Sequence, residues 1–148
     1  MGPDHRVQHP KRDVAHVLVV DDEEAARETL GAILEDTYRV SLASSGEKAV
    51  EILRKQEVDA VCTDLQMPGM SGIELLRQLP QISPRTVGIL VTGYPELTAD
   101  VDRHRGHLLV VKPYTTENLL RMVAQAVSFS RIRTLMAADA TRSGSSGP

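Results

Sequence analysis

The sequence predicts an α/β fold in which helices cover both faces of a parallel sheet. Short aliphatic runs alternate with longer amphipathic segments, which is the pattern of successive βα units. With 148 residues and 41% hydrophobic residues, the chain is long enough for one domain with a substantial core and too short for two. The expected strands are residues 16–20, 39–43, 59–63, 86–91 and 107–111.

Helical spacing and capping residues place the first three helices between these strands. The first helix carries apolar residues about one turn apart, and the second opens with a capping box between Ser44 and Glu47. The third helix opens with the same signal at Ser71 and Glu74. The sequence therefore predicts a helix after each of the first three strands.

The last two helices are predicted to differ strongly in length. Residues 95–106 leave room for only about two turns, with a thin apolar stripe at Leu97 and Val101. The fifth helix begins near Thr115, and its apolar pattern continues on a shifted stripe to about Met136. Such a helix is roughly 33 Å long at 1.5 Å per residue and would extend past the domain.

The same patterns predict the domain boundaries. Residues 1–13 are polar and aperiodic, which indicates a flexible tail, and residues 14–128 form the domain. Residues 129–138 are expected to extend the fifth helix. Residues 139–148 end in a Ser/Gly-rich stretch and are interpreted as a flexible tail or a cloning remnant.

Composition excludes several classes of function. A net charge of -3 and only 3% aromatic residues argue against direct binding of nucleic acid. The longest apolar runs are far shorter than the roughly 20 residues of a membrane span, so no membrane association is expected. The single cysteine, Cys62, is expected to pack in the core of a cytoplasmic protein, and the five histidines are interpreted as surface or loop residues.

Chemically active side chains follow four of the five expected strands. Asp21 and Asp22 follow the first strand, Asp64 follows the third, Thr92 the fourth and Lys112 the fifth. In an open parallel sheet these positions converge at one edge. Three carboxylates there repel one another, and a cluster of hard oxygens is the environment that Mg²⁺ prefers. The sequence therefore predicts a magnesium and phosphate site, although Asp21 and Asp22 could also serve as a helix N-cap.

These residues together resemble the receiver domain of bacterial response regulators. The resemblance spans about residues 16–127 and rests on four motifs in the expected order, namely Asp21-Asp22, the segment Asp64–Gly72, Thr92-Gly93 and Lys112-Pro113-Tyr114. It implies a flavodoxin-like, doubly wound (βα)5 three-layer sandwich with strand order 2-1-3-4-5. Two helices would cover one face of the sheet and three the other.

The resemblance also implies the role of each residue. Asp64 would be the phosphoacceptor, and Mg²⁺ would be held by Asp22, by Asp21 through water, by Asp64 and by the backbone carbonyl of Gln66. Lys112 would pair with a phosphoryl oxygen, and the Thr92 hydroxyl would bind another. The switch region would comprise Leu109, Gly93 and Tyr94, and the Lys112–Pro113 bond would be cis.

The implied partners follow from this chemistry. A sensor histidine kinase or a phosphotransfer protein would supply the phosphoryl group, and a downstream protein or a fused output domain would read the change. Two surfaces are open for a homodimer, the face from the fourth to the fifth helix and the extended last helix. Many receivers carry an aromatic residue where this chain has Leu109, so the readout is expected to be atypical.

Three alternatives compete with this interpretation. A phosphatase with an aspartyl-phosphate intermediate would typically show Asp-x-Asp, whereas Asp64 is followed by Leu65 and Gln66. A flavin carrier would need a phosphate-binding loop after the first strand, where four acidic residues stand instead. A degenerate receiver that acts as an unphosphorylated scaffold remains, although the complete acidic, Thr and Lys set argues against it. No turnover of a separate substrate is expected.

Overall fold

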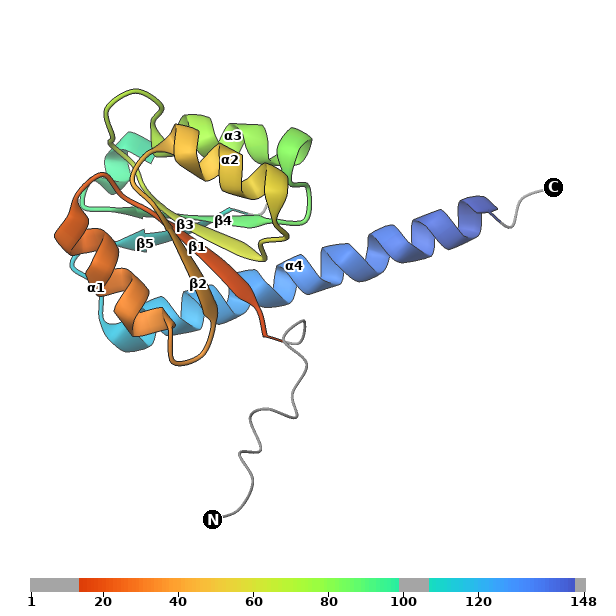
Figure 1. The fold of residues 1–148 in the computed structure, drawn as a ribbon. Coiled ribbons are helices and arrows are strands. Elements are labelled where there is room, and N and C mark those ends of the chain that lie inside the picture. The colour runs from red at the N-terminus through yellow and green to blue at the C-terminus, as the bar shows by residue number, and fades with distance from the viewer. Residues whose placement is uncertain (1–13, 99–106, 146–148) are drawn as a thin grey trace, which may run out of the picture.

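The protein is a three-layer α/β sandwich from which one long helix projects (Figure 1). The structure, a computed structural model, describes residues 14–98 and 107–145. Within those ranges the elements are β1 His16–Val20, α1 Glu24–Leu34, β2 Arg39–Ala43, α2 Gly46–Lys55, β3 Ala60–Asp64, α3 Gly72–Ile82, β4 Val87–Thr92, the 3-10 helix η3 Pro95–Thr98, β5 Leu108–Val111 and α4 Thr116–Ser145.

All five strands are parallel, in the order β2-β1-β3-β4-β5. The predicted fold class and strand order are thereby confirmed. The strand bounds agree with the predicted ones to within one residue, and β3 and β4 each begin and end one residue later than predicted. Asp64 and Thr92 are consequently the last residues of their strands rather than the first residues beyond them.

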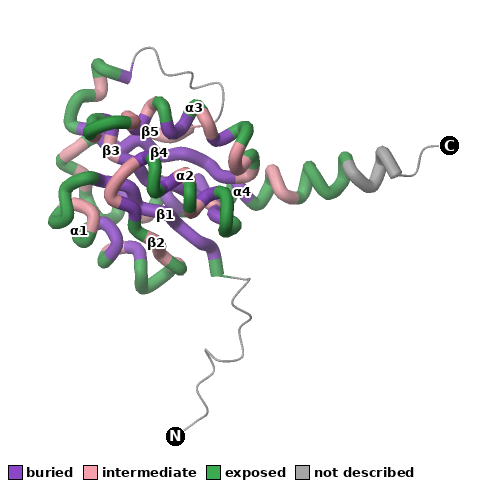
Figure 2. The backbone as a smooth tube through the Cα atoms, turned by 45° about the horizontal axis from the view of Figure 1, so that its top comes forward, coloured by how far each residue is buried: buried purple, intermediate pink, exposed green. Residues whose placement is uncertain are grey.

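Alternate strand residues face two separate cores. Val17 and Val19 of β1 pack with α1 and α4, whereas Leu18 and Val20 pack with α2 and α3. Figure 2 shows the buried strands between these helix layers. This alternation follows from the two-residue period of a strand, and it explains why the strands read as continuous apolar runs.

The described residues contain two α-helices on each face of the sheet. The expectation was two helices on one face and three on the other. The fourth-helix segment is described only as η3, one short 3-10 turn in which Leu97 is 48% exposed. Val101, the second residue of the predicted stripe, lies outside the described residues, as does the predicted tail 1–13.

Helix α4 is longer than predicted. It continues to Ser145, so the helix end expected near residue 138 is wrong. The tail predicted for residues 139–148 is wrong for residues 139–145, which are helical. The physical reason is local. Residues 137–140 include three alanines, the best helix formers, and no proline interrupts the segment. At 1.5 Å per residue the 30-residue helix is about 45 Å long.

Two local predictions differ in detail. The N-cap of α2 is Ser45, whose side chain accepts a hydrogen bond from the Lys48 amide, and not Ser44. The predicted Ser71 cap of α3 is confirmed by its bond from the Glu74 amide. His16 is buried inside β1, so its interpretation as a surface or loop residue is wrong. None of the described helices has the length and apolar character needed to cross a bilayer.

Candidate functional site at the carboxyl edge of the sheet

The strand order brings the predicted site residues to neighbouring positions. β3 lies between β1 and β4, so Asp64 at its end is flanked by Asp21 and Asp22 on one side and by Thr92 on the other. β5 lies beside β4, which adds Lys112 at the same edge. All five side chains predicted to carry the chemistry therefore lie at one edge of the sheet.

Three carboxylates form a compact cluster at this edge. Asp21, Asp22 and Asp64 each offer an oxygen, and these oxygens all lie within 4.8 Å of one another. Asp21 is buried, Asp64 is half-buried and Asp22 is exposed, so the cluster opens toward solvent on the Asp22 side. Burial raises the pKa of Asp21 above its usual value, and the nearby Asp64 charge raises it further.

Local hydrogen bonds hold Asp21 in place. Its Oδ1 accepts a bond from the Glu23 amide at 2.9 Å, and its backbone carbonyl accepts one from Arg27 Nη1 at 2.7 Å. The N-cap of α1 is Glu23, and it makes no side-chain cap bond. Neither aspartate is thus the N-cap residue itself, although Asp21 satisfies one amide at the start of the helix.

Lys112 provides the positive charge at the site. Its Nζ lies 3.3 Å from Asp64 Oδ1, and the two side chains are 38% and 19% exposed. The Lys112 amide donates to the Thr92 carbonyl at 2.8 Å, which fixes the lysine beside the end of β4. The Lys112–Pro113 bond is cis, the conformation that the resemblance implied.

The end of β4 places a hydroxyl next to these charges. Thr92 is buried, and its Oγ1 accepts a hydrogen bond from the Tyr94 amide at 2.9 Å. This bond uses a lone pair of the oxygen, so the hydroxyl proton remains available as a donor. Gly93 and Tyr94 are exposed, and a Cβ at Gly93 would meet only the Lys112 Cβ, at 3.9 Å. Gly93 thus leaves space beside Lys112.

The loop after β3 turns back tightly onto Asp64. The Gly72 amide donates to the Leu65 carbonyl at 2.9 Å, and a Cβ on Gly72 would lie 2.1 Å from the Asp64 carbonyl oxygen. Only glycine fits so close an approach. Gly69 adopts a φ of 75°, which also favours glycine. The sequence pattern identified Ser71-Gly72 as a cap but missed this contact with the backbone of Asp64.

The remaining predicted switch residue lies away from the charged cluster. Leu109, in the edge strand β5, is half-buried and packs against the core on the α2 and α3 face. It contributes no polar group.

The acidic cluster fits a small divalent cation. All of its side-chain donors are carboxylate oxygens, the hard ligands that Mg²⁺ prefers. Among the described residues, Lys112 is the one lysine paired with the cluster, and Arg27 reaches the backbone carbonyl of Asp21 rather than a carboxylate. The excess of negative charge at a partly buried position is what a divalent ion would neutralise.

The fold and this site define an α/β signalling domain with an acidic cluster at the carboxyl edge of its sheet. The family model of the response regulator receiver domain matches residues 17–124. The chain belongs to this family, whose members are receivers of two-component phosphorelay systems.

Curated relatives are transcriptional regulators and other receiver proteins. The chain is 34% identical over 116 residues to the hydrogenase transcriptional regulatory protein HoxA of Cupriavidus necator. This alignment covers 76% of this chain and 24% of that protein. It is 31% identical over 137 residues to the positive alginate biosynthesis regulatory protein of Pseudomonas aeruginosa, covering 90% of this chain and 55% of that protein. The chain thus spans between a quarter and about half of these relatives.

Solved structures support the same assignment. The signal receiver domain of an HD domain-containing protein from Pseudomonas fluorescens Pf-5 is similar with a TM-score of 0.75 and 28% identity, covering 82% of this chain and 92% of that one. A CheY-like receiver domain protein from Methanospirillum hungatei JF-1 gives a TM-score of 0.74 and 25% identity, over 81% and 98% of the two chains.

Proposed function

We propose that Asp64 is the phosphoacceptor of this receiver domain. The observation that carries the proposal is the position of its carboxylate, 3.3 Å from Lys112 Nζ and inside the cluster with Asp21 and Asp22. No other described aspartate combines a lysine contact with two neighbouring carboxylates. Nothing in the described residues favours the unphosphorylated scaffold.

The reaction transfers a phosphoryl group from a phosphohistidine of a sensor kinase or phosphotransfer protein. An Asp64 carboxylate oxygen forms the new P–O bond while the P–N bond to imidazole breaks, and its electron pair returns to the ring nitrogen. The released nitrogen takes a proton from solvent, so the product is an acyl phosphate plus a histidine. Positioning and charge neutralisation dominate such a loose transfer.

Each neighbouring group has a defined task in this proposal. Asp22 and Asp64 would hold Mg²⁺ directly, the Gln66 backbone carbonyl would complete the protein ligands, and Asp21 would act through water. When bound, the ion neutralises negative charge on the phosphoryl oxygens. The Lys112 ammonium pairs with one phosphoryl oxygen, and the Thr92 hydroxyl donates to another. The same groups would assist hydrolysis of the acyl phosphate, with no separate substrate.

The domain boundaries and the signalling partners belong to the same proposal. The receiver unit comprises residues 14–128, and since α4 is continuous to Ser145, its boundary with the helical extension that begins at residue 129 lies inside a helix. A downstream protein or a fused output domain reads the phosphorylated state in the cytoplasm, through switch residues that include Leu109, Gly93 and Tyr94.

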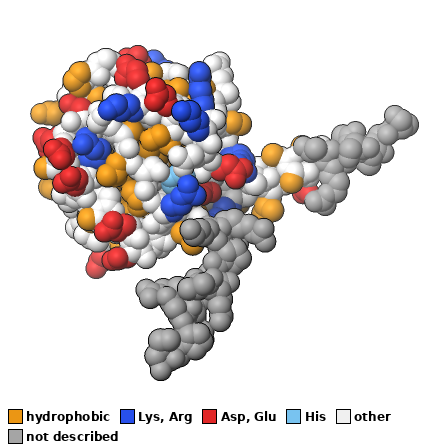
Figure 3. Space-filling model, viewed as in Figure 1, with side chains coloured by type: hydrophobic (Ala, Val, Ile, Leu, Met, Phe, Trp, Pro, Cys, Tyr) orange, Lys and Arg blue, Asp and Glu red, His pale blue; other side chains and the backbone are white. Residues whose placement is uncertain are grey.

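Of the two expected dimer surfaces, the extended half of α4 has the more specific support. Phe129, Ile132, Leu135 and Met136 are between 36% and 69% exposed. The spacing of positions 129, 132 and 136 is that of a helix-pairing seam. Figure 3 shows orange side chains along the described part of the projecting helix. The face from the fourth to the fifth helix falls partly outside the described residues.

Phosphorylation of the intact chain tests the central proposal. The chain is incubated with a small-molecule phosphodonor, with and without Mg²⁺, and its intact mass is measured. The wild type should gain one phosphoryl group only with Mg²⁺, and Asp64→Asn should gain none. Asp36→Asn changes an exposed aspartate outside the cluster and should behave like the wild type. Equal phosphorylation of Asp64→Asn would contradict the proposal.

A further inference from the structure

The side chain of Arg27 reaches back over the first turn of α1 to the end of β1. Its Nη1 donates a hydrogen bond at 2.7 Å to the backbone carbonyl of Asp21. Side chains of a helix lean toward the helix N-terminus, so this position is well placed to reach the segment that precedes the helix. Arg27 thereby connects α1 with the segment that carries two of the three clustered carboxylates.

The bonded carbonyl belongs to the peptide unit that joins Asp21 to Asp22. A peptide unit is planar, so a bond to its oxygen fixes the orientation of the whole unit. That orientation sets the direction in which the Asp22 side chain leaves the backbone. Asp22 is exposed, and its carboxylate accepts no hydrogen bond from another described residue. The position of Asp22 in the cluster therefore depends on the backbone that Arg27 holds.

Asp21 is held at three points, and only one of them uses a side chain of another residue. Its amide donates to the Ala43 carbonyl of β2 at 3.1 Å, and its Oδ1 accepts from the Glu23 amide at 2.9 Å. These two bonds use backbone groups of Ala43 and Glu23. The third bond, to the Asp21 carbonyl, requires the guanidinium of Arg27. A substitution at Arg27 can therefore remove this one restraint and leave the other two.

The surroundings strengthen the bond between Arg27 and the Asp21 carbonyl. Asp21 is buried and Arg27 is half-buried, so water competes poorly for this contact. A buried carbonyl without a partner destabilises the fold, and a charged donor makes a stronger hydrogen bond than a neutral one. Arg27 therefore favours one backbone arrangement at Asp21 and Asp22 over those in which the carbonyl turns toward water.

Arg27 does not act as a counter-ion of the cluster. It forms no ion pair with another described residue, whereas Lys112 pairs with Asp64. A positive charge near the carboxylates would also oppose the binding of Mg²⁺. A positioning effect and a charge effect of Arg27 on metal affinity thus have opposite signs, so a measurement can separate them.

We infer that Arg27 is a positioning residue for the proposed magnesium site, and that its bond to the Asp21 carbonyl directs the carboxylates of Asp21 and Asp22 toward the ion. This inference rests on the proposed phosphoacceptor function and deepens it. Arg27 contacts neither the ion nor the phosphoryl group in this role. Loss of a group that orients metal ligands typically weakens metal affinity by about 10–100-fold. Because Arg27 bonds to the backbone and not to a carboxylate, the lower end of this range is expected.

The Mg²⁺ affinity of the full chain tests the inference directly. Mg²⁺ is titrated into the ¹⁵N-labelled wild type and into Arg27→Met, and the amide shifts around Asp64 are followed by NMR. Salt at about 0.15 M keeps the Debye length near 8 Å and weakens the charge effect. Arg27→Met keeps an apolar side chain and removes both the donor and the charge. Its dissociation constant for Mg²⁺ should rise about tenfold, whereas loss of a charge effect alone would lower it.

The rate of phosphorylation by a small-molecule phosphodonor gives a second readout. Arg27→Met should need about tenfold more Mg²⁺ to reach half of its maximal rate. The maximal rate at saturating Mg²⁺ should stay within about twofold of the wild type, because Asp64 and Lys112 are unchanged. A general loss of structure would lower the maximal rate as well. Arg27→Gln, whose amide is too short to replace the guanidinium, should shift the Mg²⁺ requirement in the same direction and decides the question if Arg27→Met folds poorly.

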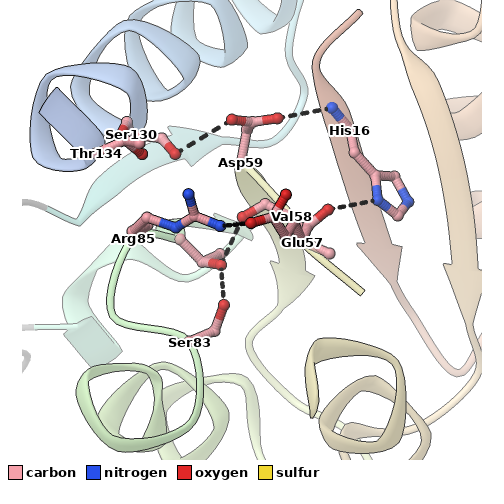
Figure 4. A network of polar contacts seen from close by, with 9 residues as sticks. His16, Glu57, Val58, Asp59, Ser83, Arg85, Ser130 and Thr134 are labelled. Atoms are coloured by element: carbon pink, nitrogen blue, oxygen red, sulfur yellow. Dashed lines mark hydrogen bonds and ion pairs between the residues drawn. The ribbon is translucent and has the colours of Figure 1, made fainter. Parts of the chain in front are cut away.

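Arg85→Met is the matched control. Arg85 lies at the opposite edge of the sheet, before β4, where it forms an ion pair with Glu57 (Figure 4). The variant removes the same charge and one side-chain contact away from the cluster, so the Mg²⁺ dissociation constant should change less than about twofold.

The outcomes separate the inference from the proposed function. The inference is overturned if the Arg27 variants bind Mg²⁺ as tightly as the wild type or more tightly, or if Arg85→Met weakens binding equally. Absence of Mg²⁺ binding near Asp64 in the wild type would instead overturn the proposed metal site, and the inference with it.

Discussion

Replacement of Asp21 by asparagine distinguishes between two interpretations of this residue. Asp21 is either a member of a metal-binding carboxylate cluster or only a hydrogen-bond acceptor at the start of α1. Asp21→Asn keeps an Oδ1 acceptor for the Glu23 amide and removes one charge from the cluster. Asparagine accepts a backbone hydrogen bond at a helix start about as well as aspartate, so if Asp21 serves only as the acceptor for the Glu23 amide, the free energy of unfolding should hardly change. The repulsion interpretation predicts that the variant is more stable than the wild type without metal.

The expected magnitude follows from the spacing of the oxygens. For two charges 4.8 Å apart, the interaction is about 0.9 kcal/mol at a dielectric constant of 80 and about 3.5 kcal/mol at an effective value of 20. Lys112 offsets part of this repulsion. We expect a gain of about 1 kcal/mol at pH 7, within a range of about 0.5–2 kcal/mol.

The pH dependence has a definite sign. Burial, followed by the charge of Asp64, raises the pKa of Asp21 in the folded state above the ordinary value of 3.8. Between these two pKa values the folded state holds the proton more tightly, so wild-type stability falls as pH rises through that window. Asp21→Asn lacks this decline, and its advantage over the wild type should shrink toward pH 3.8 and grow to pH 7.

Denaturant unfolding followed by circular dichroism measures these differences, with and without about 10 mM Mg²⁺. Mg²⁺ stabilises the folded state by mass action, because the cluster does not exist in the unfolded chain. That increment should be clearly smaller in Asp21→Asn than in the wild type. Asp36→Asn serves as the control outside the cluster. Equal stabilities within about 0.3 kcal/mol, or an undiminished Mg²⁺ increment in Asp21→Asn, would refute the reasoning.

Three further outcomes are expected. Gly72→Ala should lower the free energy of unfolding by about 1–3 kcal/mol, because the new Cβ would lie 2.1 Å from the Asp64 carbonyl oxygen. Gly93→Ala is the control and should be nearly neutral in the same denaturation assay, because its Cβ would meet only the Lys112 Cβ at 3.9 Å. Burial raises the pKa of the Cys62 thiol to about 12. A thiol reagent at pH 8 should therefore label Cys62 only as fast as the native structure unfolds locally around it. Rapid labelling of the native chain would contradict this. Ile132→Ser removes an apolar side chain from the proposed seam and should reduce self-association measured by light scattering, and an unchanged mass would contradict the extended helix as the dimer surface.

The sheet and the acidic cluster could be predicted because both depend on local patterns. Continuous aliphatic runs identify strands buried on both faces, and the residues that end them share one edge in any parallel sheet. Asp64, Thr92 and Lys112 were therefore recognisable from position alone. The length of α4 was underestimated because the apolar stripe ends near Met136, whereas alanine propensity continues the helix without tertiary support.

His16 illustrates what sequence patterns miss. Its ring contacts lie 25 and 41 residues away in the sequence, at Ser41 and Glu57. Spacing within one element carries no information about such distant partners, and a histidine before an aliphatic run resembles an exposed strand end. The burial of His16 becomes visible only when the three-dimensional pairing of β1 with β2 and β3 is known.

The polarity of a parallel sheet explains why one of its edges was predicted and the other was not. All strands run in the same direction, so residues that follow strands form one surface and residues that precede or begin them form the opposite one. Arg39, Asp59 and Arg85 begin or precede three different strands, and each alone reads as an ordinary solvated residue. They converge only because the strands align, and α4 then closes their surface with Ser130 and Leu135. The same geometry that concentrates carboxylates at one edge thus brings arginines and carboxylates from distant parts of the sequence together at the other.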